Sequence, residues 1–334
     1  MGAVLFALLL PAQGTAERPL VETSDFWREI RRPGQGRVRD LVGQGFTFLR
    51  QMAGQDAAHP MTHALLRSAL LRFERALLID PVDREALYLR AYALARFEEY
   101  EPSTGETQRR DREAIDAYLR LQTVDAHYNA GEVGFELGLL YTRIEEFPEA
   151  IAAYEYSIAH ALSPRNTAVT HSNLAEARMM SLDLVGAVRD YERAIELAQG
   201  SRRPLNLGLP LFGLAVALDR LGETSEAQQR ATEAVGVAGQ SLDHLHEDGV
   251  SFDPASEIHY YEALGHQALA ASADGEAQRR LLRAAVLSWQ AYLSRAAADD
   301  PWLSLVEERL RTAQERLRAA SERTSPRAGR HSRR

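Results

Sequence analysis

The stretch "ELGLLYTRIEEFPEAIAAYEYSI", residues 136–158, decides the fold. Its apolar residues recur at helical spacing on both sides of a short polar turn, which predicts two helices joined by a tight connection. Gly138 lies within the first of these helices, where glycine costs about 0.5–1 kcal/mol relative to alanine. Either close packing against another helix or the approach of a ligand would offset that cost.

The same spacing recurs twice along the chain. In residues 136–158 a Leu-Gly pair is followed by Tyr141, Phe147, Ala150 and Tyr154, and residues 172–197 and 212–235 repeat these offsets. The Leu-small pairs begin at positions 137, 174 and 214, so the copies are 37 and 40 residues apart. Self-similarity at such a period indicates a repeat architecture in which each unit buries its apolar face against the next.

This pattern resembles the tetratricopeptide repeat (TPR) family, whose helix-turn-helix unit reads W-x2-L-G-x2-Y, then A-x3-F and a proline. Weaker copies at 69–81, 84–122 and 260–293 extend the resemblance over about residues 65–296, although the tryptophan position is not kept. The resemblance implies an all-α protein, an α-solenoid of helical pairs that forms a right-handed superhelix.

The position of Gly138 holds alanine or glycine in the other copies, namely Ala91, Ala175, Ala215 and Gly265. Alanine would be penalised if the position required a positive φ, so the position restricts size and not backbone conformation. Packing therefore explains Gly138, and we expect alanine to be tolerated there while a larger side chain is not.

The predicted organisation follows from the repeats and their flanks. Polar stretches interrupt the array, and "PWLSLVEERLRTAQERLR" near the end reads as an amphipathic helix before apolar periodicity is lost. We predict a signal peptide at 1–16, capping helices at 17–59, a solenoid at 60–300 with insertions near 101–111 and 239–256, a capping helix at 301–320 and a disordered Arg-rich tail at 321–334.

The beginning of the chain predicts export. "MGAVLFALLLPAQGTA" has an apolar run too short to cross a bilayer, followed by small residues at Gly14 and Ala16 that suit cleavage before Glu17. We therefore expect a periplasmic or envelope-associated protein in a bacterial-type cell. A cytoplasmic location is the alternative, since no basic residue precedes the apolar run.

The amino-acid composition excludes some kinds of catalysis and some classes of binding partner. All 39 basic side chains are arginine and cysteine is absent, which excludes lysine Schiff bases and thiol catalysis. Residues 318–334 hold six arginines and one glutamate, a charge of +5, so the remainder carries −13 of the net −8. An acidic body repels phosphate, so we expect no nucleic acid as partner, while the tail offers contact with an anionic surface.

We find no catalytic motif and expect neither an enzyme nor a cofactor. The alternative is an envelope enzyme accessory with a metal site in residues 243–259. The possible ligands are scattered over a loop without a fixed helical offset, so a solvated polar insertion is the competing interpretation. These ligands are Asp243, His244, His246, Glu247, Asp248, Asp253 and His259.

The resemblance implies that the first helix of each unit lines a concave groove. Aromatic and methionine side chains there would give adaptable apolar contact, and arginines would hold a carboxylate. Asn173 matches an asparagine with which some family members clamp a carboxyl terminus, but the accompanying lysines are absent. We predict a protein-binding scaffold or assembly factor, with a cytosolic adaptor as alternative, that captures an apolar or amphipathic segment through Tyr88, Tyr92, Arg96, Phe135, Leu139, Arg143, Asn173, Glu176, Met179, Phe212, Val216 and Arg220.

Overall fold

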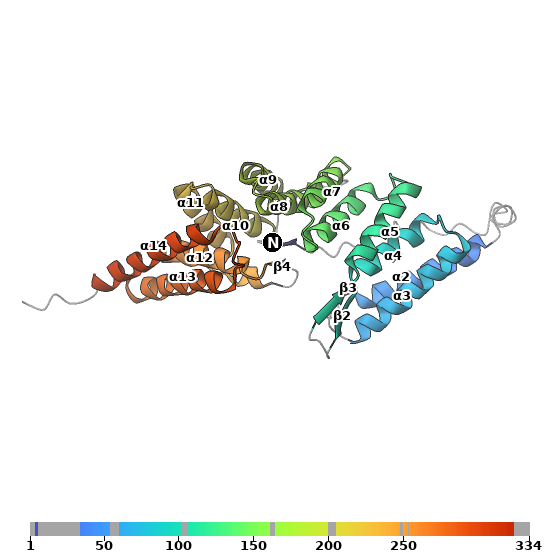
Figure 1. Ribbon diagram of the computed structural model, residues 1–334, viewed down its shortest axis with the longest axis horizontal. Coiled ribbons are helices and arrows are strands. Elements are labelled where there is room, and N and C mark those ends of the chain that lie inside the picture. Colours follow the sequence, from blue (N-terminus) through green and yellow to red (C-terminus); the bar gives the residue numbers. More distant parts are fainter. Residues whose placement is uncertain are drawn as a thin grey trace, which may run out of the picture. The chain divides into compact units, whose positions relative to one another are not determined.

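The computed structural model describes residues 4–5, 34–53, 60–101, 106–160, 164–199, 205–247, 250–252 and 254–323. Helices make up most of these residues (Figure 1). The chain divides into two compact units: the first is Leu8–His160, and the second is Ala161–Arg334 together with Met1–Ala7. The predicted all-α solenoid of helical pairs is confirmed in each unit.

In its described part, the first unit is built mainly from helices that pack as consecutive pairs, each against the next (Figure 1). Large apolar and aromatic side chains such as Phe73, Tyr88 and Tyr118 fill the spaces among them. The pairs are α2 (Gln35–Met52) with α3 (Pro60–Ile79), α4 (Arg84–Ala95) with α5 (Asp111–Val124), and α6 (Ala130–Arg143) with α7 (Phe147–Ala159).

A short β-hairpin lies between α4 and α5, where the sequence predicted a polar insertion near 101–111. Strand β2 (Glu98–Glu101) pairs antiparallel with β3 (Glu106–Arg109), in the register that sets Glu98 opposite Arg109. The guanidinium of Arg109 lies 2.9 Å from the carboxylate of Glu98. This cross-strand ion pair supports the register, because opposite charges on facing strands attract.

The second unit continues the same arrangement of helical pairs. Helices α8 (Pro164–Met180) and α9 (Leu184–Ala198), α10 (Leu205–Arg220) and α11 (Thr224–Val237), and α12 (Glu257–Ala271) and α13 (Gly275–Arg295) pair in order, and α14 (Leu303–Glu322) packs on α13. Its core contains the fully buried rings of Phe212, Tyr260, Trp289 and Tyr292. Tyr260 meets Trp289 edge to face, with ring centroids 4.7 Å apart.

The predicted insertion at 239–256 is only partly a surface loop. It contains the short 3₁₀ helix η1 (Asp243–His246) and strand β4 (Val250–Ser251), which pairs antiparallel with β1 (Val4–Leu5). His244 and Leu245 are buried against the helices instead of being solvated.

Several predicted segments lie wholly or partly outside the described residues. Of the expected signal peptide at 1–16 only Val4–Leu5 is described, and residues 17–33, 54–59 and 324–334 are not. Helix α2, expected as a cap, packs against α3 as the first helix of a pair. Among the described helices, none combines the length and the apolar character that a bilayer span requires.

Gly138 lies where α6 meets the buried ring of Tyr154 on α7. A Cβ atom built on Gly138 would lie 2.4 Å from both Cδ1 and Cε1 of that ring. Tyr154 has no exposed surface, and its hydroxyl lies 3.2 Å from the hydroxyl of Thr142. Packing therefore explains the glycine as predicted. The expectation that alanine is tolerated there disagrees with this geometry, because an added Cβ requires the buried ring of Tyr154 or the helix to shift.

Candidate functional site

The predicted groove residues of the first unit lie inside the helical array. Tyr88, Tyr92, Phe135 and Leu139 are buried, each at most 7% exposed. Arg96 forms a two-pronged ion pair with Glu136, at 2.7 and 3.2 Å, and its guanidinium lies 3.4 Å from the centre of the Tyr92 ring. These side chains hold neighbouring helices together, so the expected open surface is absent at these described positions.

Arg143 has a comparable structural role. Its guanidinium pairs with the carboxylate of Asp111 on α5 and donates a hydrogen bond of 3.0 Å to the carbonyl of Ala95 on α4. Its side chain is 13% exposed. Arg143 therefore joins three helices of the first unit instead of presenting its charge to a partner.

The predicted residues of the second unit are also buried. Asn173, Glu176, Met179, Phe212 and Val216 are each at most 1% exposed. Glu176 accepts hydrogen bonds from the hydroxyls of Tyr191 and Tyr261, the second at 3.1 Å. Burial is the main cause that raises the pKa of Glu176.

Arg220 is the most enclosed of the predicted anchors. Its Nη2 donates to both carboxylate oxygens of Glu257, at 2.7 and 2.8 Å, and its side chain has no exposed surface. Burial alone would lower the pKa of Arg220, but the charge of Glu257 raises it above its usual value. The rings of Tyr260 and Trp302 lie 4.9 and 4.8 Å from the guanidinium. Partner binding at any of these groove positions stays a prediction, and the structure gives each a role inside the fold.

The residues of the alternative metal site are only partly brought together. His244 stacks against Phe212 with ring centroids 5.3 Å apart, whereas His246 and His259 lie 3.3 and 2.8 Å from Glu262. In the parts of the chain that the structure describes, no three histidine, aspartate or glutamate side chains are placed to hold a metal ion. Asp248 and Asp253 lie outside those parts.

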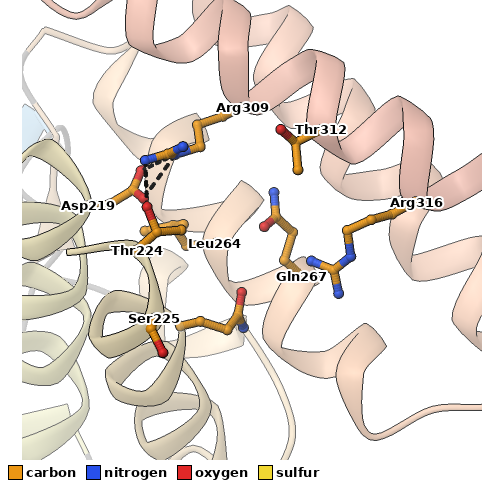
Figure 2. Close-up of a pocket in the computed structure, with 9 residues that line it drawn as sticks. Asp219, Thr224, Ser225, Leu264, Gln267, Arg309, Thr312 and Arg316 are labelled. Carbon is orange, nitrogen blue, oxygen red and sulfur yellow. Dashed lines mark hydrogen bonds and ion pairs between the residues drawn. The ribbon is translucent and has the colours of Figure 1, made fainter. Parts of the chain in front are cut away.

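A cavity of about 450 Å³ opens in the second unit, among α10, α11, α12 and α14 (Figure 2). It is the candidate functional site. The end of α10 and the beginning of α11 form one side, and α12 and α14 form the others. The lining residues are Asp219, Thr224, Ser225, Gln228, Leu264, Gln267, Arg309, Thr312 and Arg316.

One side of the cavity is held by a completed ion pair. Arg309 donates from Nε to both oxygens of Asp219, at 2.9 and 3.0 Å, and from Nη2 to the hydroxyl of Thr224 at 2.9 Å (Figure 2). The hydroxyl of Tyr260 donates a further bond of 2.7 Å to Asp219. Because Asp219 is 1% exposed and has these donors, it has little capacity left to bind a metal or a cation.

Two amides that line the cavity, those of Gln267 and Gln228, have no such partners among the described residues. Gln267 is only 7% exposed, and among the described residues nothing is hydrogen-bonded to its amide. The buried Nε2 of Gln228 likewise has no acceptor there. A buried donor without a partner costs about 1–3 kcal/mol, which applies to the enclosed Nε2 of Gln228, whereas the amide of Gln267 is the one that is open to the cavity.

Arg316 brings a charge that no described acid neutralises. Figure 2 shows its guanidinium turned toward the same space as Gln267 and Thr312. With Arg309 and Asp219 cancelling, the lining carries one net positive charge. The cavity therefore presents amide and guanidinium donors to a small anionic group.

Sequence reasoning did not predict this cavity. Its side chains come from positions 219–316 and none belongs to a known catalytic or binding motif. One weak signal exists: Ser225, Gln228 and Gln267 are polar residues on helices whose other copies bear apolar or charged residues.

Comparison with known proteins identifies the fold. No family model matches the chain, and no curated protein is similar enough to count as a relative. Among solved structures, PilF of Pseudomonas aeruginosa is 15% identical, with a TM-score of 0.50 over 84% of this chain and 99% of that one. A tetratricopeptide repeat protein from Parabacteroides merdae is 11% identical, with a TM-score of 0.49 over 83% of this chain and 98% of that one. MamA from Desulfovibrio magneticus is 15% identical, with a TM-score of 0.47 over 61% of this chain and 97% of that one.

Proposed function

The chain has the fold of the tetratricopeptide repeat proteins, and from that premise we propose that it is an exported scaffold or assembly factor that binds a segment of another protein. Repeat solenoids of this kind offer extended binding surfaces and have no set of catalytic groups common to the fold. The fold therefore suits binding more than catalysis. Fold alone does not define function, so the proposal rests on the site.

The observation that carries the proposal is the cavity beside Gln267 and Arg316. The amide of Gln267 and the guanidinium of Arg316 have no acceptor in the described chain, so a bound partner would supply the acceptors. We therefore place partner capture at this cavity and not at the predicted groove residues, whose side chains would have to leave the core to reach a partner.

Export supports an envelope role and stays a proposal of its own. It rests on the apolar run of residues 3–10 and the small residues that follow. In the envelope the partner would be a protein segment exposed on the same side of the membrane, and the apolar or amphipathic character that we expect of it would add contact around the cavity rim.

In-cell photocrosslinking tests the proposal. A photoreactive residue placed at Ser225 or Thr312, both exposed on the rim, should give a discrete adduct with one protein of the native cell. The same residue at Leu287, exposed on α13 and absent from the cavity lining, serves as the control. Equal adducts from all three positions, or none from the rim, would refute capture at the cavity.

A further inference from the structure

The exposed face of α13 combines arginine side chains with a leucine. We propose that this face, together with the end of α14, binds an anionic lipid surface and so holds the protein against a membrane. The inference goes beyond the proposed function, because it concerns a surface that is separate from the cavity and a partner that is not a protein.

The face is a stripe of residues three or four positions apart, which lie above one another along a helix. Its members are all exposed: Arg280, Arg283, Leu287, Gln290 and Ser294. Glu276, the one acidic residue of α13, is hydrogen-bonded to Arg279. In the described chain no acid forms an ion pair with Arg280 or Arg283, so the stripe presents two positive charges followed by uncharged side chains.

The end of α14 adds positive charge beside the stripe. Leu282 of α13 packs with Ala320 of α14, so α14 ends next to the beginning of α13 (Figure 1). Arg318 and Arg323, both exposed, therefore lie at the same end of the second unit, although two exposed glutamates of α14 offset part of their charge. Residues 324–334, which follow α14 in the chain, contain four arginines and no acidic residue.

The charge of the whole chain is divided in the same sense. Residues 275–334 hold thirteen arginines and seven acidic residues, a charge of +6, so the remainder carries −14 of the net −8. An anionic lipid surface attracts arginines that come close to it and repels acidic groups. Such a surface would therefore turn α13 and α14 toward itself and the acidic remainder away.

The side chains beside the arginines favour lipid over nucleic acid. Leu287 is 59% exposed within the stripe, and an exposed leucine on a basic helix face can enter the boundary between head groups and acyl chains. Proteins that bind single-stranded nucleic acid stack its bases on exposed aromatic rings. The aromatic residues of α13, Trp289 and Tyr292, have no exposed surface.

Co-sedimentation of the full chain with lipid vesicles tests the inference. We expect binding to vesicles of phosphatidylcholine and phosphatidylglycerol in equal parts, and binding at least about tenfold weaker to phosphatidylcholine alone. Raising sodium chloride from about 0.03 M to about 0.3 M should weaken binding to the mixed vesicles, because salt shortens the range of the attraction.

Paired variants make the test specific for α13. Arg280→Gln combined with Arg283→Gln should weaken binding to the mixed vesicles at least about tenfold, both in the full chain and in a chain that ends at residue 323. Arg37→Gln combined with Arg39→Gln removes two exposed charges from α2 and should leave binding unchanged. Circular dichroism must show that each variant is folded.

A tryptophan in place of Leu287 reports contact at the stripe itself. In Leu287→Trp the emission should shift to shorter wavelength when mixed vesicles are added, because the ring enters a less polar environment. Leu71→Trp, at a position that is 46% exposed on α3, is the control and should show no such shift.

The inference is overturned if the folded variant of Arg280 and Arg283 binds mixed vesicles as well as the native chain, if removal of residues 324–334 alone abolishes binding, or if the emission of Leu287→Trp does not change. Tighter binding of a single-stranded oligonucleotide than of mixed vesicles, lost in the same arginine variant, would also overturn it and assign the face to nucleic acid. The rim crosslinks at the cavity test the proposed function independently of these results.

Discussion

Gly134 and Gly138 on α6 face α7 at distances that leave no room for a methyl group. A Cβ on Gly134 would lie 2.8 Å from the backbone nitrogen of Ser157 and 2.9 Å from the carbonyl oxygen of Ala153. At Gly138 the obstacle is the ring of Tyr154. At these positions the small residue of the repeat pattern lies where two helices touch. The size of the residue that fits there depends on which atoms of the second helix lie against it.

Alanine at position 138 should destabilise the first unit. Overpacking of a closed core costs about 1–3 kcal/mol, which exceeds the gain of up to about 1 kcal/mol from replacing a helical glycine. The control is Gly43→Ala on α2, where no atom lies within 4 Å of the added Cβ, so stability should rise by about 0.5–1 kcal/mol. Urea denaturation measures both, and a stabilised Gly138→Ala would show that Tyr154 yields.

Arg220→Met should damage the fold of the second unit. It leaves the carboxylate of Glu257 buried with Tyr292 as its remaining donor, at 3.3 Å, and breaking a buried ion pair costs about 3–5 kcal/mol. Adding Glu257→Met should recover at least about 2 kcal/mol, because both charges are then absent. Denaturation of the two single variants and the double variant measures the coupling, and additive losses would contradict a paired role.

The positions of the arginines could be predicted from the sequence, but their partners were missed. The pattern located Arg96, Arg143 and Arg220 on helices, and we predicted that they face solvent. Each pairs with an acid roughly one repeat away, 40 residues to Glu136, 32 to Asp111 and 37 to Glu257. Opposite charges separated by one repeat length were a readable signal, since adjacent repeats stack in register.

At the scale of elements, the turns that join the two helices of a repeat share one backbone geometry. Glu145, Leu182 and Gly222 follow α6, α8 and α10 at equivalent positions, with φ of 61°, 64° and 89°. After each, the next amide bonds back to a carbonyl five residues earlier, at 2.9–3.0 Å. This is a Schellman end, which normally favours glycine at the left-handed position.

Leu182→Gly should therefore stabilise the second unit by about 0.5–1 kcal/mol. A left-handed conformation costs a non-glycine residue about 1–2 kcal/mol, and Leu182 is 56% exposed, so little packing is lost. Gly222→Ala is the matched opposite and should destabilise by a similar amount. Thermal unfolding of both compares them directly, and a loss of stability in Leu182→Gly would mean that its side chain contributes more than its exposure indicates.

His244 should make the stability of the second unit depend on pH. Burial is the largest influence on the pKa of His244 and lowers it below its usual value of 6.5. The charges of Glu247 and Asp243 oppose this shift, whereas His246 adds to it. The unfolded chain therefore binds a proton at His244 more readily than the folded chain does. The stability that neutral His244 contributes is present above about pH 6.5 and is lost as pH falls through the pKa of the folded state. In His244→Phe, which keeps the stacking on Phe212, the slope of unfolding free energy against pH between 5 and 7 should become smaller. An unchanged slope would place the titration elsewhere, for example at His266, whose pKa burial also lowers.

Helices could be predicted from the sequence far better than the short strands. Hydrophobic spacing located every helix of the three best copies, because each must bury one face. The hairpin of β2 and β3 has no alternating apolar pattern, being "EEYE" and "ETQR", so it was treated as a polar insertion. Likewise, the burial of His244 depends on Phe212, which lies far away in the sequence.

At the scale of the whole molecule, the repeat fold follows from the sequence while the candidate site does not. The fold is encoded by offsets within about 40 residues that recur several times. The cavity combines Ser225, Gln267 and Arg316 from three helices, and this combination is not part of the repeated pattern. Repetition reveals what every unit shares, whereas the site consists of what one unit has and the others lack.

Export is the remaining prediction for the chain as a whole. The apolar run and the small residues before Glu17 predict that the mature protein lacks residues 1–16, and β1 (Val4–Leu5) would then be removed from β4. Because only two residues pair there, a chain that begins at Glu17 should unfold within about 0.5 kcal/mol of the full chain, while amide exchange at Val250 becomes faster. Mass measurement of protein from its native cell should show a start near Glu17 in the envelope fraction. An intact Met1 form confined to the cytoplasm would refute export, and a large loss of stability on removing 1–16 would show that this segment belongs to the mature fold.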